Sequence, residues 1–412
     1  MSAAPVSTVP DDPFAHLNPE QRSAVDHDIG IQAGSSRPLL VLAGAGHAHA
    51  RVLRDFALEP APNNSGIEII LVTPSPLAPY SGMVPGWMAG HYTWDECCID
   101  FAHLCRRAGA TLRIGMVGAI DLQASSVRLE SGEQLPYDVL SLDIGSTATP
   151  PPANGLALLP MRPLAQLKER WNGLRATVRA LPDGAAYRVL VVGGGAAGVE
   201  TMLATRRQLA QWAPRVVLEC VLATQGNTLL PALAGAAGTK IEAHLRKHGM
   251  RVVYGFEAQR CDAAGVVSAD GARLDADVVL WATGAQAHAM PHASGLACDG
   301  AGFIRVDSAL RSVSHPNVFA SGDCASCASP VPKAGVFAVR MGPVLSHNLR
   351  ACLEAQPLRT YAPQRRNLVL LGTGGEHAVA AWGPFSWQGD WVWRWKRRID
   401  LRFLQQYNGA SH

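Results

Sequence analysis

The sequence predicts an α/β protein with two Rossmann-like, three-layer ββα dinucleotide-binding domains, the second inserted in the first, followed by a C-terminal segment. A strand pattern, a glycine-rich turn, a helical pattern and a second strand occur twice, starting at 39–46 and at 188–198. In the first unit the strand spans 39–43 and the helix runs from 47 to about 58. Short strands at 111–114, 126–129 and 139–142 follow it as a small meander, and a strand pair near 251–280 follows the second unit. This order indicates a duplication of fold and not of sequence. The 412 residues fit about two to three domains.

Composition restricts the functional class. Charged residues make up 17% of the chain and the net charge is +3, so we expect no nucleic-acid partner. The nine cysteines and the polar start of the chain favour a reducing, cytoplasmic location over a disulfide scaffold. No apolar run reaches the roughly eighteen residues that a membrane span needs, which still permits a protein lying on the membrane surface.

The second glycine-rich turn is a complete dinucleotide fingerprint. Gly193, Gly195 and Gly198 stand between a strand at 188–192 and a helical pattern. The first glycine permits the tight turn, the second lets the backbone approach a pyrophosphate, and the third lets the helix pack on the sheet. The helix N-terminus then faces the phosphates, so we predict a dinucleotide there.

The first turn is a weaker copy of this motif. Gly44 and Gly46 are present, but His49 stands where the third glycine is expected. Alone, this turn is equally consistent with a plain strand–turn–helix. His47 and His49 lie at the helix N-terminus, where a neutral ring can donate to a pyrophosphate or simply pack in the core.

Three later segments complete the pattern. Two apolar strands break at Gly145 and at Gly284, where the chain can pass close to a bound nucleotide. A third strand ends at Gly322 and delivers Asp323 to the edge of the sheet where α/β proteins bind ligands. The second strand of each unit ends without the acidic residue that binds a ribose, which leaves NADH and NADPH equally open.

Further motifs lie at 46–49, 74–86 and 332–336 and in the spaced residues Lys396, Ile399, Asp400 and Phe403. With these motifs, the chain from about 38 to 407 resembles flavoproteins with two dinucleotide-binding domains. These are the type II NADH dehydrogenases, sulfide:quinone reductases and pyridine nucleotide-disulfide oxidoreductases, and above all the NADH dehydrogenase-like group sometimes fused to selenide water dikinase.

The resemblance implies FAD in the first unit and NAD(P)H in the second. It implies FAD contacts at Gly44, Gly46, His47, His49, Pro79, Tyr80, Val117, Gly145, Gly322, Asp323, Gly335 and Val336. It implies NAD(P)H contacts at Gly193, Gly195, Gly198 and Gly284. Glu200 would lie near the nicotinamide and Lys333 near the flavin or substrate, and we take these two as the catalytic candidates. No metal site is expected.

The expected domains follow from the same resemblance. Residues 38–150 and 300–350 form the FAD domain, 151–299 the NAD(P)H domain and 351–412 a C-terminal segment. We expect a disordered extension at 1–37. Residues 17–46 also resemble the opening of superfamily I helicases, but the lysine and threonine of a phosphate loop are absent after the last glycine, so no helicase activity is predicted.

The predicted function is hydride transfer from NAD(P)H to FAD and onward to a quinone or another small acceptor. One alternative is a sulfide or selenium-compound oxidoreductase that uses Cys324 or Cys327, and another is a redox-sensing flavoprotein with little turnover. Tryptophans and basic residues alternate through 382–407. They predict peripheral contact with the cytoplasmic membrane face, a homodimer contact, or a helix closing the protein's own core.

Overall fold

The computed structural model describes residues 37–59, 66–233, 235–364 and 366–409. The predicted extension at 1–37 falls outside this part of the chain except for its last residue, and so does most of the helicase-like stretch.

The first parallel sheet forms the base of the first half of the molecule. Its strands are ordered β19-β9-β1-β2-β5, and each neighbouring pair is parallel. Every residue of β1 is buried, as expected for a continuous apolar run in a parallel sheet covered on both faces. The strands are β1 Leu39–Ala43, β2 Glu68–Thr73, β5 Thr111–Ile114, β9 Val139–Leu142 and β19 Val318–Ala320.

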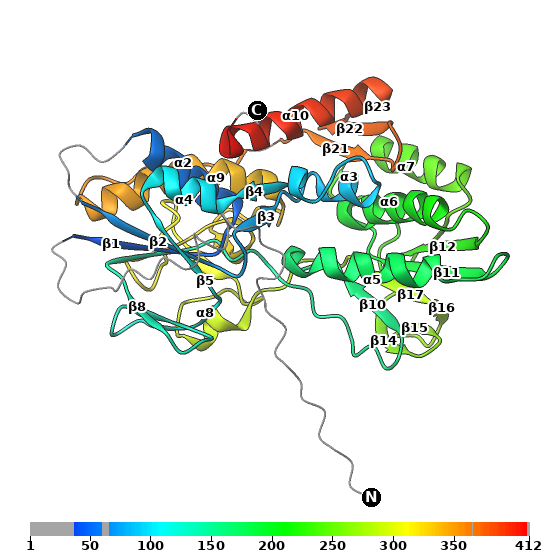
Figure 1. Cartoon of the computed structure of the whole chain (residues 1–412), viewed down its shortest axis with the longest axis horizontal. Helices are drawn as coiled ribbons and strands as arrows, with labels where there is room; N and C mark the ends of the chain where they lie inside the picture. The colour runs from blue at the N-terminus through cyan, green and yellow to red at the C-terminus, as the bar shows by residue number, and fades with distance from the viewer. Residues whose placement is uncertain (1–36, 60–65, 234, 365, 410–412) are drawn as a thin grey trace, which may run out of the picture.

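Helices cover one face of this sheet and a small meander lies on the other (Figure 1). The helices are α2 His47–Leu58, α4 Phe101–Ala108 and α9 Gly335–Leu353. The antiparallel meander is β6 Val117–Asp121, β7 Ser126–Leu129 and β8 Gln134–Pro136. Smaller elements of this half are β3 Leu77–Pro79, α3 Val84–Met88, η2 Asp95–Cys97, β4 Cys98–Asp100, α8 Ala289–Ala293, β18 Ile304–Val306, η4 Gly322–Cys324 and β20 Ala325–Cys327.

The second parallel sheet repeats the plan with the order β10-β17-β11-β12-β13. Its strands are β10 Ala157–Pro160, β11 Ala186–Val192, β12 Val217–Ala223, β13 Arg251–Val253 and β17 Val278–Trp281. Its helices are η3 Leu164–Gln166, α5 Leu167–Arg179, α6 Ala196–Trp212 and α7 Gly235–Lys247, and its meander is β14 Ala258–Asp262, β15 Gly265–Ser268 and β16 Arg273–Asp275.

The order of the strands confirms the predicted fold class. The first sheet takes four strands from before the second sheet and β19 from after it, so one α/β unit interrupts the other. One expectation was wrong in detail. The stretches 111–114 and 139–142, read as meander strands, belong to the parallel sheet, because β5 pairs with β2 and β9 with β1.

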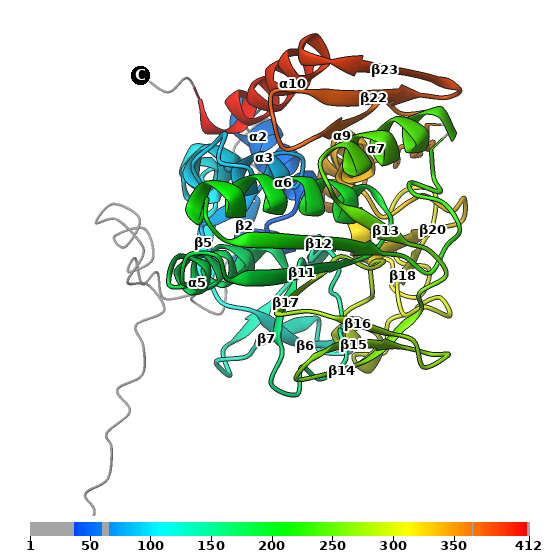
Figure 2. The same cartoon turned by 90° about the vertical axis from the view of Figure 1, so that its right-hand side faces the viewer.

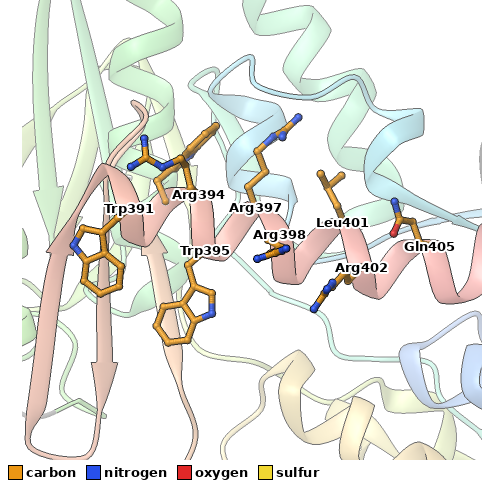
Figure 3. A pocket seen from close by; sticks show the side chains of 9 residues that line it. Trp391, Arg394, Trp395, Arg397, Arg398, Leu401, Arg402 and Gln405 are labelled. Carbon is orange, nitrogen blue, oxygen red and sulfur yellow. The ribbon is translucent and has the colours of Figure 1, made fainter.

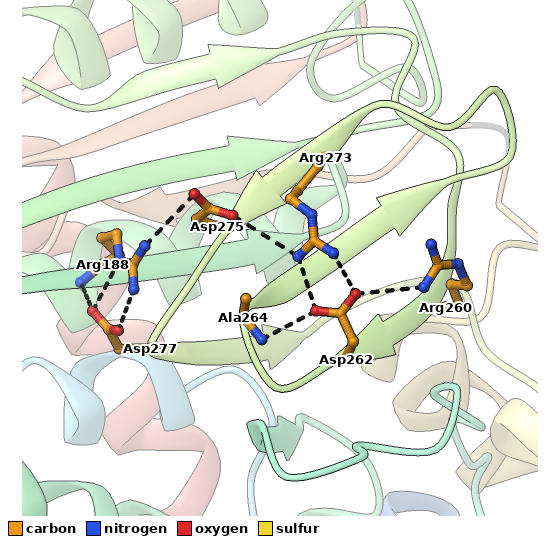
Figure 4. Close-up of polar contacts among 7 residues, drawn as sticks. All are labelled: Arg188, Arg260, Asp262, Ala264, Arg273, Asp275 and Asp277. Carbon is orange, nitrogen blue, oxygen red and sulfur yellow. Dashed lines mark hydrogen bonds and ion pairs between the residues drawn. The ribbon is translucent and has the colours of Figure 1, made fainter.

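Ion pairs fasten the meander of the second half to its sheet (Figure 4). Arg188 on β11 lies 3.7 Å from Asp275 on β16 and 2.7 Å from Asp277, and Arg273 on β16 contacts Asp262 on β14 at 2.5 Å. These side chains are largely solvent-exposed, so each pair contributes little to stability. They lie on the outer edge of the domain and we assign them no chemical role.

The C-terminal segment is a three-stranded antiparallel sheet followed by a long helix. It contains β21 Val369–Gly372, β22 Ala378–Trp382, β23 Phe385–Gly389 and α10 Asp390–Asn408. Figure 1 and Figure 2 show α10 crossing over both halves, with the small sheet beside α7. Among the described helices, none combines the length and apolarity that crossing a membrane requires.

Candidate functional site

The first glycine-rich turn packs closely against the end of β9. Gly44 has a φ of +97°, a conformation that favours glycine. A Cβ at Gly44 would lie 2.5 Å from the Asp143 backbone oxygen, and one at Gly46 would lie 2.1 Å from the Asp143 Cγ. Both glycines are therefore required by the close approach of the two strand ends.

His49 fills the position of the missing third glycine. Its ring is buried, with Nδ1 2.6 Å from the Gly44 oxygen and Nε2 2.8 Å from the Ser141 hydroxyl. Burial lowers the pKa of His49 to about 4, so the ring is neutral. Because both nitrogens are used inside the protein, His49 ties the turn to β9, which corresponds to the core-packing alternative.

His47 occupies a different environment. Its ring meets the edge of Tyr80 at a centroid distance of 5.4 Å, and burial lowers its pKa to about 4. Its Nε2 is buried and has no hydrogen-bond partner among the described residues. A Cβ at Gly335 would lie 2.8 Å from the Ser81 hydroxyl and 3.7 Å from His47 Cε1.

Three sequence-distant segments thus converge at the start of α2: the Tyr80 loop, the N-terminus of α9 and the glycine turn. A buried ring nitrogen without a partner is a group that a ligand can satisfy. These residues could therefore hold part of a bound FAD. Pro79 ends β3 directly before Tyr80, while Val117 at the start of β6 and Val336 in the first turn of α9 are half-buried.

Asp323 stands at the C-terminal end of β19, as predicted. Gly322 before it has a φ of +64°. The Asp323 carboxylate accepts hydrogen bonds from Arg162 and Ser146, each at 2.9 Å. Gly145, with a φ of +68°, has open space around its Cα. This carboxylate can accept a hydroxyl of a bound nucleotide while it pairs with the Arg162 guanidinium.

The second fingerprint contains two glycines that close packing requires and one that faces open space. A Cβ at Gly193 would lie 2.3 Å from the Ala282 oxygen, and one at Gly198 would lie 1.8 Å from the Gly193 oxygen. Gly195 and Gly284 instead have nothing within 4 Å of such a Cβ. The turn is therefore closely packed at Gly193 and Gly198 and open at Gly195. A pyrophosphate requires such an open approach to the backbone.

The Lys333 ammonium makes its contacts within its own domain. Its Nζ donates to the Ala325 oxygen at 2.5 Å and lies 3.8 Å from the centroid of the Phe303 ring. Burial lowers its pKa. The ammonium is thus engaged within its own domain, and we assign it a packing role.

Glu200 belongs to a buried polar group that joins three parts of the chain. Its Oε1 accepts the Gly372 backbone N–H at 2.8 Å, and burial raises its pKa to about 7. Lys396 on α10 donates to the Gly82 oxygen at 2.6 Å and to Asp400 Oδ2 at 2.8 Å. Burial alone would lower the pKa of Lys396, but the Asp400 and Glu200 carboxylates hold it above its usual value.

Asp400 extends this group toward the first turn. It accepts a hydrogen bond from the Tyr80 hydroxyl, and burial raises its pKa despite the neighbouring ammonium. A small cavity of about 20 Å³ adjoins the group where α3, α6, β21 and α10 meet, and its lining includes Tyr92, Glu200, Trp393, Lys396, Arg397 and Asp400. Sequence reasoning placed neither Lys396 nor Asp400 in the site, although both stand in a motif that carried the resemblance.

The cysteines considered for covalent chemistry are not activated. Cys324 is buried, and its thiol donates to the Ser321 oxygen at 3.1 Å. Burial raises its pKa to about 12 and also raises the pKa of half-buried Cys327. A nucleophilic relay needs a thiolate. Because burial keeps these thiols protonated, their environment does not favour such a relay.

Comparison with known proteins places this geometry in a family. A family model described as pyridine nucleotide-disulphide oxidoreductase matches residues 40–342. The biphenyl dioxygenase system ferredoxin–NAD(+) reductase component of Paraburkholderia xenovorans is 34% identical over 51% of this chain, and the chain spans about half of it (49%). An NADH dehydrogenase-like protein of Mycobacterium tuberculosis is 28% identical over 70% of this chain and 74% of its own length.

Among solved structures, the sulfide:quinone oxidoreductase of Aquifex aeolicus has the same fold. Its TM-score is 0.73 at 16% identity, covering 90% of this chain and 92% of that one. The matches confirm the predicted superfamily and an oxidoreductase with FAD and NAD(P)H as its nucleotides.

Proposed function

Because the chain belongs to the pyridine nucleotide-disulphide oxidoreductase family, we propose that it oxidises NAD(P)H through FAD and delivers the electrons to a quinone-type acceptor. The observation that carries the choice of acceptor is the buried group of Tyr80, Glu200, Lys396 and Asp400 beside the cavity at the junction of the two halves.

The residues divide the work between two nucleotide sites. Bound FAD supplies the two-electron chemistry, while the protein supplies binding and orientation. The turn at Gly44 and Gly46, with His47 and Asp323, would hold FAD. The open turn at Gly195 would hold the pyrophosphate of NAD(P)H on the N-terminus of α6.

Proton supply favours a quinone over a pure electron carrier. Two-electron reduction of a quinone to a quinol consumes two protons, whereas reduction of an iron–sulfur protein consumes none. Glu200, with its pKa raised to about 7, is suited to give a proton near neutral pH. Lys396 and Asp400 keep this carboxyl in a fixed electrostatic environment. A ferredoxin-type acceptor, as in the name of one relative, would leave these groups without a task.

A sulfur-linked mechanism finds less support. The Cys324 thiol is buried and hydrogen-bonded to backbone oxygens, and its pKa is raised. We therefore propose electron transfer without a cysteine adduct.

The exposed side of α10 supports contact with a membrane. Trp391, Trp395, Arg398 and Arg402 recur at helical spacing along one side (Figure 3). The two tryptophan rings stack at 6.3 Å and are 49% and 37% exposed. Indole rings prefer the interface, and guanidinium groups attract anionic headgroups. We propose that this face places the enzyme on an anionic bilayer, where quinones dissolve.

Vesicle binding tests this part of the proposal. The protein should sediment with vesicles containing phosphatidylglycerol, and R398E/R402E should lose most of this binding. R106E/R107E, with both changes on exposed positions of α4, is the matched control and should bind normally. Equal binding by all three proteins, or self-association through this face in sedimentation velocity, would contradict membrane contact.

The acceptor is tested by steady-state assay. NADH oxidation should be supported by a short-chain quinone more strongly than by a ferredoxin, and sulfide should not reduce the flavin. Faster turnover with ferredoxin would reject the quinone assignment. Flavin reduction by sulfide that is abolished in Cys324→Ser would restore the sulfur-linked alternative.

A further inference from the structure

A buried carboxylate lies at the N-terminus of α2, inside the proposed FAD site. Asp143 follows β9 directly and is 3% exposed. Its Oδ2 accepts the backbone N–H groups of Ala48 at 2.9 Å and His49 at 3.2 Å. The side chain therefore caps α2 from another strand and occupies part of the positive end of the helix.

The surrounding backbone is shaped to this carboxylate. A Cβ at Gly46 would lie 2.2 Å from Asp143 Oδ2, and a Cβ at Gly322 would lie 2.5 Å from Oδ1. Asp143 thus lies between the glycine turn and the Asp323 turn, which are the two segments assigned to FAD. No larger side chain fits at either glycine while Asp143 is in place.

No cation faces Asp143 from the described elements packed against it. From α2, the rings of His47 and His49 are kept neutral by burial, which lowers the pKa of each to about 4. From η4, Cys324 keeps its proton because burial raises its pKa to about 12, and Asp323 adds a like charge.

The nearby cations are engaged elsewhere. Arg162 pairs with Asp323 at 2.9 Å, and Lys333 donates to the Ala325 oxygen. Two backbone N–H groups alone compensate the charge on Asp143, and burial raises its pKa to about 7.

We propose that Asp143 couples FAD binding to the uptake of a proton, so that the protein holds FAD with Asp143 protonated and releases it as Asp143 ionises. The inference rests on the proposed FAD site. A pyrophosphate brings negative charge to the same helix N-terminus, and two anions there repel each other in a site that excludes water. A protonated Asp143 removes this repulsion.

The direction in which pH changes the affinity for FAD follows from proton linkage. Binding of an anion raises the pKa of Asp143 further, so the complex holds more protons than the free protein between the two pKa values. The dissociation constant for FAD should therefore be lowest below about pH 7 and rise by up to about tenfold per pH unit above it.

The experiment is equilibrium dialysis of the full-length protein against FAD from about pH 6 to about pH 9. Asp143→Asn keeps an oxygen for the Ala48 and His49 N–H groups without a charge, so it should bind FAD tightly at every pH. Asp138→Asn makes the same change at the residue that caps the Leu39 N–H at 2.6 Å. This control should keep the wild-type pH dependence.

The outcomes distinguish failure of the proton coupling from failure of the proposed FAD site. A flat wild-type profile, or an Asp143→Asn profile that still follows pH, overturns the coupling while leaving the FAD site intact. Failure of the wild type to bind FAD at any pH refutes the proposed function and the coupling together. Calorimetry of the wild type in two buffers of different ionisation enthalpy measures the proton uptake directly, and it decides the matter even if Asp143→Asn does not fold.

Discussion

Replacing Lys396 with methionine should move the pH dependence of acceptor reduction. The substitution keeps the side-chain volume but removes the ammonium that donates to Gly82 and Asp400 and that faces Glu200. The Lys396 side chain is 13% exposed and that of Asp400 is 6% exposed. Two buried carboxyl groups, Asp400 and Glu200, then share the region without a cation.

Two effects set the magnitude. Removing one partner of a buried ion pair costs about 3–5 kcal/mol of unfolding free energy. Protonation of Asp400 offsets part of this cost. Loss of a neighbouring positive charge raises a carboxyl pKa by about 1–3 units, so the pKa of Glu200 should move from about 7 toward the range of about 8–10.

The direction in which pH changes folding stability follows from the direction of the Glu200 pKa shift. The pKa of Glu200 is raised on folding, so its contribution to stability is fully present below the pKa of the unfolded chain. That contribution is lost as the pH rises through about 7 in the wild type. In Lys396→Met the loss should occur at higher pH.

The assay is stopped-flow reoxidation of the reduced protein by a soluble quinone across pH. The alkaline decline in rate should begin near about pH 7 in the wild type and at least about one unit higher in Lys396→Met. Lys396→Arg keeps the charge and should restore the wild-type profile, while Lys247→Met on the exposed side of α7 should have no effect. An unchanged profile in Lys396→Met would refute the role of Lys396 in setting the protonation of Glu200.

Two further variants test the nucleotide sites. Gly198→Val should abolish NAD(P)H binding in calorimetry but leave FAD bound, because even a Cβ would lie 1.8 Å from the Gly193 oxygen; loss of FAD with retained NAD(P)H binding would show that the two sites are assigned the wrong way round. Asp323→Ala should lose most of its FAD on gel filtration because it removes the carboxylate held by Arg162, whereas Asp307→Ala in a surface turn should retain it; full retention in Asp323→Ala would reject its role.

The sequence was sufficient where the signal is local. The strand at 39–43 and the helix at 47–58 coincide with β1 and α2, since a continuous apolar run, a glycine turn and a helical pattern define them. The sequence did not show that 111–114 and 139–142 belong to the first parallel sheet, because a short apolar run does not specify its partner strand.

The site required contacts that only the folded chain provides. His49 satisfies its ring through Ser141, which is 92 positions away, and Asp143 caps α2 across 95 positions. The pairing of β1 with β9 creates both contacts. Glu200 and Lys396 meet because α10 crosses both halves, a packing arrangement that no spacing in the sequence encodes. The contacts of the Lys333 ammonium with the Ala325 oxygen and the Phe303 ring likewise depend on the folded chain.

The most direct test of the central claim is the absorbance spectrum of the purified protein during an anaerobic titration with NADH and with NADPH. One site for FAD and one for NAD(P)H predict a flavin spectrum, release of FAD on denaturation, and bleaching at one equivalent of at least one of the two nucleotides. A colourless protein that cannot be reconstituted with FAD, or bound flavin that neither nucleotide bleaches, would contradict it.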